Sequence, residues 1–158
     1  MRYHLQDFNL PGYELPLNLT LAVVLCGDSG LGKTQLALAH FTYPVLIRRI
    51  EDLHGIGLRT DGLVFDDLSF RDWEPEPVIA LLDTEQDSSI HCRYTDARIP
   101  ANMPRIFTTN LTCENRYTTI FPDGKNEAQQ YAIDRRFMRV GPITSDLRVT
   151  PVGAADDG

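Results

Sequence analysis

The sequence predicts an α/β fold in three layers, with a mostly parallel central sheet covered on both faces by helices. Short apolar segments alternate along the chain with segments of helical pattern, which is typical of a parallel sheet. The first apolar run is continuous rather than alternating, as in a strand buried on both faces. With 158 residues, 42% of them hydrophobic, the chain is long enough for one domain with a core and too short to be divided into two.

The amino-terminal half is expected to contain three strands and one helix. The run LTLAVVLC, residues 19–26, ends at a glycine and predicts the first strand. KTQLALAH, residues 33–40, predicts a helix, and the short apolar run at residues 44–47 predicts a second strand. A third strand over residues 63–65 runs into two carboxylates.

The second half continues the alternation of helices and strands. Pro75 and Pro77 frame the start of a helix from Val78 to Asp83, because proline is tolerated in a first helical turn. Residues 89–99 alternate weakly and predict a hairpin. A fourth strand is expected at residues 105–109, a helix around residues 127–137, and a fifth strand at residues 138–143.

Charge and cysteine content limit the class of protein. The net charge of -7 and the pI near 5.0 argue against a broad basic surface for nucleic acid, and leave room only for a local basic element. The cysteines, Cys26, Cys92 and Cys113, are odd in number and form no C-x-x-C pair, so we expect no zinc or redox centre and a reducing, intracellular compartment. The first residues resemble neither a signal peptide nor a membrane span, and no membrane partner is expected.

The segment GDSGLGKT matches the phosphate-binding pattern G-x-x-x-x-G-K-[ST] at every fixed position, between a predicted buried strand and a predicted helix. Its backbone N–H groups would surround phosphate oxygens, and its glycines permit close approach. Lys33 would reach the β- and γ-phosphates, and the Thr34 hydroxyl would ligate magnesium. We therefore expect ATP and Mg²⁺ as cofactors; a plain glycine turn is the alternative. The expected nucleotide-binding residues are Gly27, Asp28, Ser29, Gly30, Leu31, Gly32, Lys33 and Thr34.

Two adjacent acids follow the third strand in GLVFDD, which is the Walker B arrangement of P-loop NTPases. Neighbouring residues on a strand point to opposite sides, so one carboxylate can face magnesium and the other the attacking water. We assign Asp66 to the metal and Asp67 to the water, and the reverse assignment stays open. Acid pairs after strands can also cap the next helix.

Three further residues are candidates for catalysis. Asn110 closes the strand RIFTTN, where its amide could hydrogen-bond the γ-phosphate or position water, although a turn role is the alternative. Arg135 and Arg136 lie near the end of a predicted helix in AIDRRFMRV. Either could stabilise transition-state charge on a neighbouring subunit's nucleotide, or be a solvated helix-end cation.

Taken in order, the motifs GDSGLGKT, GLVFDDLSF, HCRYTDARIPANMPRIFTTN and AIDRRFMRV resemble the superfamily 3 helicase domain of replication-initiator (Rep) proteins from small circular single-stranded DNA viruses. The resemblance covers roughly residues 19–142. It implies an AAA+-related ATPase that assembles into a hexameric ring and translocates 3′ to 5′ on single-stranded DNA to unwind the replicating genome. By this resemblance Lys33 and Thr34 belong to Walker A, Asp66 and Asp67 to Walker B, Asn110 is the motif C sensor, and Arg135 or Arg136 is the arginine finger.

The family also carries a DNA-contacting hairpin between the acidic pair and the sensor asparagine, usually with a lysine and glycines. Here the segment is IHCRYTDARIP, which has neither a lysine nor a glycine pair. Arg93, Tyr94 and Arg98 are the candidate DNA contacts, because cations hold phosphates and an aromatic ring can stack on a base. A plain surface hairpin is the alternative.

Full-length relatives carry an amino-terminal nicking endonuclease, and fewer than about two dozen residues precede the first strand here, far below the size of a domain. We therefore expect the motor without the nuclease, which becomes a possible partner. The chain divides into an extension at residues 1–18, a P-loop ATPase/helicase domain at residues 19–143, and a tail at residues 144–158 that we expect to be flexible.

The sequence thus favours an ATP-dependent DNA helicase domain of a viral replication initiator, acting in the host nucleus if the virus infects a eukaryote. Two alternatives stay open: a P-loop small-molecule kinase, and a nucleotide-dependent assembly module that does not unwind DNA.

Overall fold

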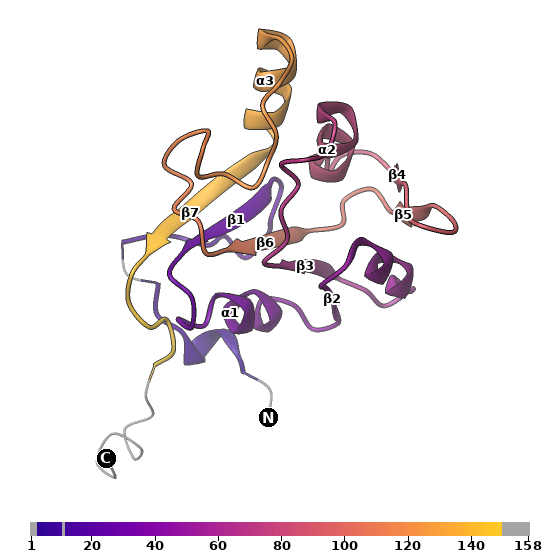
Figure 1. Ribbon diagram of the computed structural model, residues 1–158. Helices are drawn as coiled ribbons and strands as arrows, with labels where there is room; N and C mark the ends of the chain where they lie inside the picture. The colour runs from indigo at the N-terminus through magenta and orange to yellow at the C-terminus, as the bar shows by residue number, and fades with distance from the viewer. Residues whose placement is uncertain (1–2, 11, 150–158) are drawn as a thin grey trace, which may run out of the picture.

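The computed structural model describes residues 3–10 and 12–149. Five parallel strands form one sheet in the order β2-β3-β6-β1-β7 (Figure 1), and a separate antiparallel pair, β4 and β5, forms a small hairpin. The α/β class with a parallel sheet is therefore confirmed. The strands are β1 (Ala22–Gly27), β2 (Pro44–Ile47), β3 (Gly62–Asp66), β4 (Ser88–Ile90), β5 (Ala97–Ile99), β6 (Arg105–Thr109) and β7 (Phe137–Ile143).

Helices cover both faces of the sheet. α1 (Lys33–Ala39) lies on one face, while α2 (Pro75–Leu82) and α3 (Glu127–Asp134) lie on the other (Figure 1). Alternate residues of β1 separate between the two sides: Val23 and Leu25 join the core beneath α1, and Val24 joins the core on the opposite face. Two 3₁₀ helices, η1 (Leu5–Asp7) and η2 (Ile50–Gly55), complete the elements.

The helices and strands lie close to their predicted positions, with small shifts at their ends. β1 begins three residues later than predicted, at Ala22. α2 begins at Pro75, three residues before the predicted start at Val78, so both prolines lie in its first turn. α3 ends at Asp134 rather than near residue 137, because the chain re-enters the sheet as β7 from Phe137. None of the helices in the described part of the chain is long and apolar enough to cross a membrane.

A cluster of aromatic side chains fixes β3 against β6. Phe65 stacks on Phe107, with ring centroids 4.3 Å apart, and Phe70 meets both rings edge-on. All three are buried. Aromatic pairs of this geometry add to the free energy gained by burial. The cluster therefore holds the two strands whose ends carry the acidic pair and Asn110.

The segments at the two ends of the described chain pack together. The backbone N–H of Asn9 donates to Leu147 O (2.8 Å), and that of Val149 donates to Asp7 O (2.7 Å). Leu147 is buried in the core beneath α1. The packed domain therefore continues beyond Ile143 to at least residue 149, and only residues 150–158 of the expected tail lie outside the described residues.

Among residues 3–10 and 12–149, the side chain of Arg105 is a charged group that lies entirely inside the domain. Arg105, at the start of β6, is fully buried and donates hydrogen bonds to Leu81 O (2.6 Å) and to Met103 O (3.1 and 2.9 Å). Burial lowers the pKa of Arg105 to about 10, although the nearby Asp83 acts in the opposite direction. Arg105 thus connects the end of α2 to the segment that leads from the hairpin into β6.

Candidate functional site

The phosphate loop, the acidic pair and Asn110 meet at the carboxyl ends of the parallel strands. Parallel strands end on the same side, so the residues that follow β1, β3 and β6 come together there. They line a cavity of about 390 Å³. Its lining residues are Gly30, Gly32, Lys33, Thr34, Gln35, Arg48, Asp66, Asp67, Thr108, Asn110 and Arg148.

Glycine is required by the backbone at two points of the loop. Gly27 has φ +145° and abuts the backbone of Ile143, so a side chain there would collide with β7. Gly32 has φ +92°, a region that favours glycine, and a Cβ there would lie 3.2 Å from Cγ of Arg148. The pattern of glycines in the sequence therefore reflects both conformation and close packing.

Lys33 lies at the centre of the site. Its side chain is buried, and Nζ donates to the carbonyl oxygens of Gly27 (2.8 Å) and Asp28. Nζ also lies 3.4 Å from Oδ1 of Asn110. Burial lowers the pKa of Lys33, while the carboxylates of Asp67 and Asp28 oppose that shift. The ammonium is thus placed where it could meet phosphate oxygens.

Thr34 and Asp66 are the neighbouring oxygen donors of the site. The Thr34 hydroxyl donates to Oδ1 of Asp66 at 2.8 Å. A magnesium ion characteristically takes one or two protein oxygens and completes its shell with phosphate oxygens and water, so these two residues fit such an ion. No cluster of three or more His, Cys, Asp or Glu side chains suited to a metal occurs among residues 3–10 and 12–149.

Asp67 departs from the expected strand geometry. β3 ends at Asp66, and Asp67 has φ +54°, so the argument from alternating side chains holds only as far as Asp66. The backbone N–H of Asp67 donates to Thr108 O (3.1 Å), which fixes this turn against β6. The Asp67 carboxylate still lies in the cavity and close enough to Lys33 to influence its pKa.

Two arginines of the cavity were not predicted. Arg48 directly follows β2, and its Nε lies 3.5 Å from Oδ2 of Asp66. Its position after an apolar strand was a signal that sequence reasoning could have used. Arg148 comes from the segment expected to be a flexible tail, so no pattern in the sequence pointed to it.

The candidate arginine fingers lie at the opposite ends of the strands, where β7 begins. Arg135 and Arg136 fall between the end of α3 and the start of β7, and neither lines the cavity. Figure 1 shows that β7 begins beside α3 and runs away from it along β1. Arg136 is held in place, because it donates to Ala132 O (2.7 Å) and lies 3.8 Å from Oδ2 of Asp83. Arg135 is exposed, and its side chain bonds to nothing within the described residues. Neither arginine reaches the cavity of its own chain.

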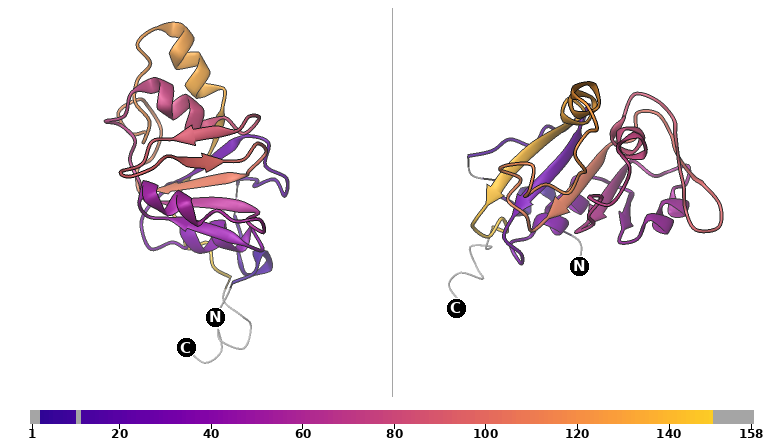
Figure 2. Two further views of the ribbon diagram at one scale, coloured as in Figure 1. Left: turned by 90° about the vertical axis from the view of Figure 1, so that its right-hand side faces the viewer. Right: turned by 45° about the horizontal axis from the view of Figure 1, so that its top comes forward.

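The candidate DNA contacts lie on the hairpin, apart from the cavity. Figure 2 shows the hairpin region at the end of the molecule farthest from β7. The Arg93 guanidinium lies over the Tyr94 ring, 5.3 Å from its centroid, and Tyr94 is 86% exposed. Arg98 instead forms an ion pair with Asp87 (2.5 Å). Cys92, which directly precedes Arg93, is buried, and its thiol donates to Ile50 O at the start of η2. This contact anchors the loop on η2.

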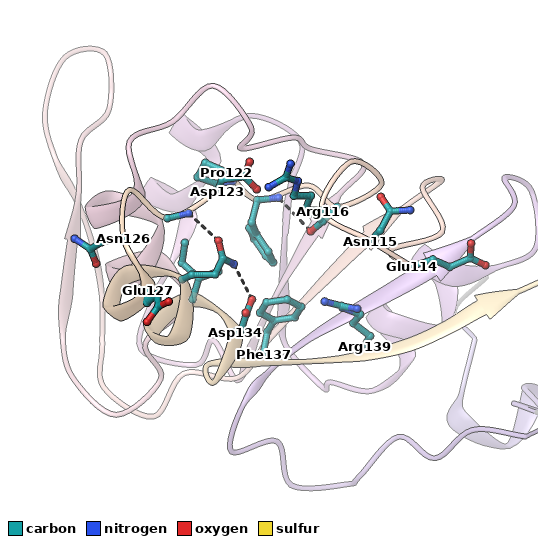
Figure 3. Close-up of a pocket in the computed structure, with 15 residues that line it drawn as sticks. Glu114, Asn115, Arg116, Pro122, Asp123, Asn126, Glu127, Asp134, Phe137 and Arg139 are labelled. Atoms are coloured by element: carbon teal, nitrogen blue, oxygen red, sulfur yellow. Dashed lines mark hydrogen bonds between the residues drawn. The ribbon is translucent and has the colours of Figure 1, made fainter.

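A larger cavity of about 470 Å³ lies between α3, β7 and the loop after Asn110. Figure 3 shows Arg116 and Asp123 on the loop side and Phe137 and Arg139 on the β7 side. None of the candidate nucleotide-binding, catalytic or DNA-contacting residues lines this cavity. The smaller cavity at the phosphate loop is therefore the candidate functional site, because the candidate residues line it.

A disulfide joins Cys26 to Cys113, across 87 residues of sequence. Cys26 directly precedes Gly27, and Cys113 lies three residues after Asn110, so the bond links the two segments that line the cavity. The sequence did not suggest this pair, and the expected intracellular location stays a prediction.

Comparison of the sequence with models of known protein families and with curated proteins gives no match in either set. The interpretation of the site therefore depends on its own geometry and on its motifs.

Proposed function

We propose that the chain is the ATP-dependent helicase domain of a viral replication initiator, with a three-layer P-loop NTPase fold of the AAA+/superfamily 3 type. The observation that carries this proposal is the convergence of Lys33, Thr34, Asp66, Asp67 and Asn110 on one cavity. These residues come from three separate sequence motifs. A cation, two adjacent oxygen donors, a further carboxylate and an amide are the groups that ATP hydrolysis with magnesium requires.

The order of the strands supports hydrolysis in particular. β6 lies between β1 and β3, so Asn110 lies between the phosphate loop and the acidic pair. In this position its amide can orient a water molecule toward the terminal phosphate. A small-molecule kinase would instead need a site for an acceptor hydroxyl, and the motif residues supply none.

Each residue of the candidate site has a separate role in this mechanism. Lys33 and the backbone N–H groups of the phosphate loop bind and orient the phosphates, and Thr34 and Asp66 would hold magnesium. Bound magnesium neutralises charge that develops on the phosphates. Asp67 accepts a proton from the attacking water, which Asn110 orients.

The proposed partners are further copies of the chain, single-stranded DNA and a nicking endonuclease domain; the exposed arginines support the first two, and the family resemblance implies the third. Arg135 would complete the site of a neighbouring copy in a homo-oligomeric, hexameric ring, because it cannot reach its own cavity. Arg93 and Tyr94, with Arg98, would contact single-stranded DNA. A nicking endonuclease domain would act with this motor, in the host nucleus if the virus infects a eukaryote.

The test is an ATPase assay with and without single-stranded DNA, combined with measurement of the oligomer mass. We expect turnover that DNA stimulates and that Lys33→Ala abolishes. Lys125→Ala is the matched control, because it removes the chain's other lysine, which is exposed and pairs with Glu74. Unchanged turnover in Lys33→Ala would exclude the proposed site.

The same assay separates the alternatives. Turnover that requires a small-molecule acceptor would favour a kinase. Nucleotide binding with ring formation but without DNA-stimulated turnover would favour the assembly module.

A further inference from the structure

Arg148 lines the phosphate-loop cavity although it belongs to no motif. Its Nη2 donates to Gly30 O (2.9 Å), in the middle of the loop. Its side-chain stem passes over Gly32, the residue before Lys33. Arg148 therefore lies against the part of the chain that would surround phosphate.

The backbone delivers this side chain from a fixed position. On one side, the N–H of Leu147 donates to Leu31 O (2.9 Å) and the Leu147 side chain is buried. On the other side, the N–H of Val149 donates to Asp7 O (2.7 Å). Arg148 itself forms an antiparallel bridge with Phe8. The segment is therefore anchored to the loop and to the amino-terminal segment together.

The guanidinium is also oriented. Nε lies 2.9 Å from Oδ1 of Asp146 and Nη2 lies 3.0 Å from Oδ2, a two-point contact that fixes the plane of the group. The hydrogen bonds from Arg148 hold the pKa of the Asp146 carboxyl below its ordinary value. Asp146 does not line the cavity, whereas Arg148 does.

The charge balance of the cavity depends on this residue. Lys33, Arg48 and Arg148 bring three positive charges, and Asp66 and Asp67 bring two negative ones, which leaves one positive charge. Without Arg148 the balance is zero. A triphosphate carries several negative charges, and a planar guanidinium matches phosphate oxygens better than any other side chain.

We propose that Arg148 is a nucleotide-binding residue, whose guanidinium contacts the phosphate chain of the nucleotide bound at the phosphate loop. This inference rests on the proposed nucleotide site. It makes the segment after β7 part of that site, so that nucleotide affinity depends on residues outside the Walker motifs.

The test is calorimetric titration of the full chain with the non-hydrolysable ATP analogue AMPPNP and Mg²⁺. We expect Arg148→Gln to weaken binding about tenfold, and Arg148→Lys to stay within about threefold of wild type. Glutamine keeps an N–H donor for Gly30 O but loses the charge, so it separates a phosphate contact from a brace of the loop. Arg59→Gln, which removes an exposed arginine packed on Tyr43, is the control and should bind as wild type does.

Salt provides a second readout. A charged contact predicts that the affinity of wild type falls more steeply with salt than that of Arg148→Gln. The inference would be overturned if Arg148→Gln bound AMPPNP with the same affinity and the same salt dependence as wild type, even if the variant were less stable. If Lys33→Ala loses binding while Arg148→Gln keeps it, only this inference fails; if wild type binds no AMPPNP, the proposed function fails.

Discussion

Arg135 and Arg136 are adjacent, yet the structure predicts opposite consequences for their removal. Arg135 is exposed and makes no side-chain bond in the described structure. Arg136 is mostly buried and bound to Ala132 O and Asp83. We expect Arg135→Ala to leave stability unchanged and to abolish turnover in the assembled protein. Arg136→Ala should mainly lower stability.

The magnitudes follow from geometry. The seven residues of β7 separate Arg135 from the cavity edge by about 20 Å, at about 3.3 Å per residue, so the side chain cannot serve its own site. An arginine finger contributes about 10³-fold or more to kcat, and we expect Arg135→Ala to lose that factor. Arg136→Ala loses a short hydrogen bond and a partly buried ion pair, which should lower the free energy of unfolding by about 1–3 kcal/mol.

The decisive assay mixes two inactive variants. Lys33→Ala has a defective site but an intact Arg135, and Arg135→Ala has the reverse. In a closed ring assembled at random from equal amounts, half of the sites are intact and half of those face an intact arginine, so the mixture should regain about one quarter of the wild-type rate. Urea unfolding of each variant supplies the stability comparison.

Two results would refute this reasoning. Full turnover of assembled Arg135→Ala would remove the finger assignment. A mixture that co-assembles but stays inactive would show that Arg135 does not act between subunits.

Three further predictions concern stability. Replacing the buried Arg105 by alanine leaves a cavity and unpaired carbonyl groups, and should lower the free energy of unfolding by about 3–5 kcal/mol in urea titrations; a loss below about 1 kcal/mol would contradict the role we give it. Burial, opposed by the carbonyl of Leu17 and by Asp61, lowers the pKa of His40 from 6.5, so the neutral form is favoured on folding. Stability should therefore be fully present above about pH 6.5 and fall on acidification below it; His40→Gln should flatten this dependence and the exposed-site control His54→Gln should not. Reduction of Cys26–Cys113, which closes a long loop, should lower the free energy of unfolding by about 2–5 kcal/mol, and an unchanged urea midpoint in dithiothreitol would show that the bond does not stabilise the fold.

Most of the fold was predictable because its signals are local. The continuous apolar run before Gly27 indicates a strand buried on both faces, and every residue of β1 is buried. The acidic pair and Asn110 each follow a predicted strand. Because parallel strands end on the same side of a sheet, these residues could be assigned to one site.

What could not be predicted depends on contacts between distant segments. Cys26 and Cys113 become neighbours only once β1 pairs with β6, where Cys26 lies opposite Thr109. Arg105 would be expected at the surface, because its side chain is charged. The carbonyl groups of Leu81 and Met103 that bind it in the core cannot be recognised from a local sequence pattern. Arg148 lies in the site because the segment after β7 packs on the phosphate loop, and the composition of that segment could not show this contact.

The pairing of β1 with β7 explains how one chain could serve two nucleotide sites. At one end, the N–H of Ala22 donates to Arg136 O (3.1 Å), directly beside the exposed Arg135. At the other end, the N–H of Asp28 in the phosphate loop donates to Ile143 O (3.0 Å). The same two paired strands therefore fix the distance between the candidate finger and the phosphate loop. Because a packed strand pair bends little, a nucleotide bound at one edge and a neighbouring copy docked at the other would be held in a constant relative position, which repeated subunits in a closed ring require.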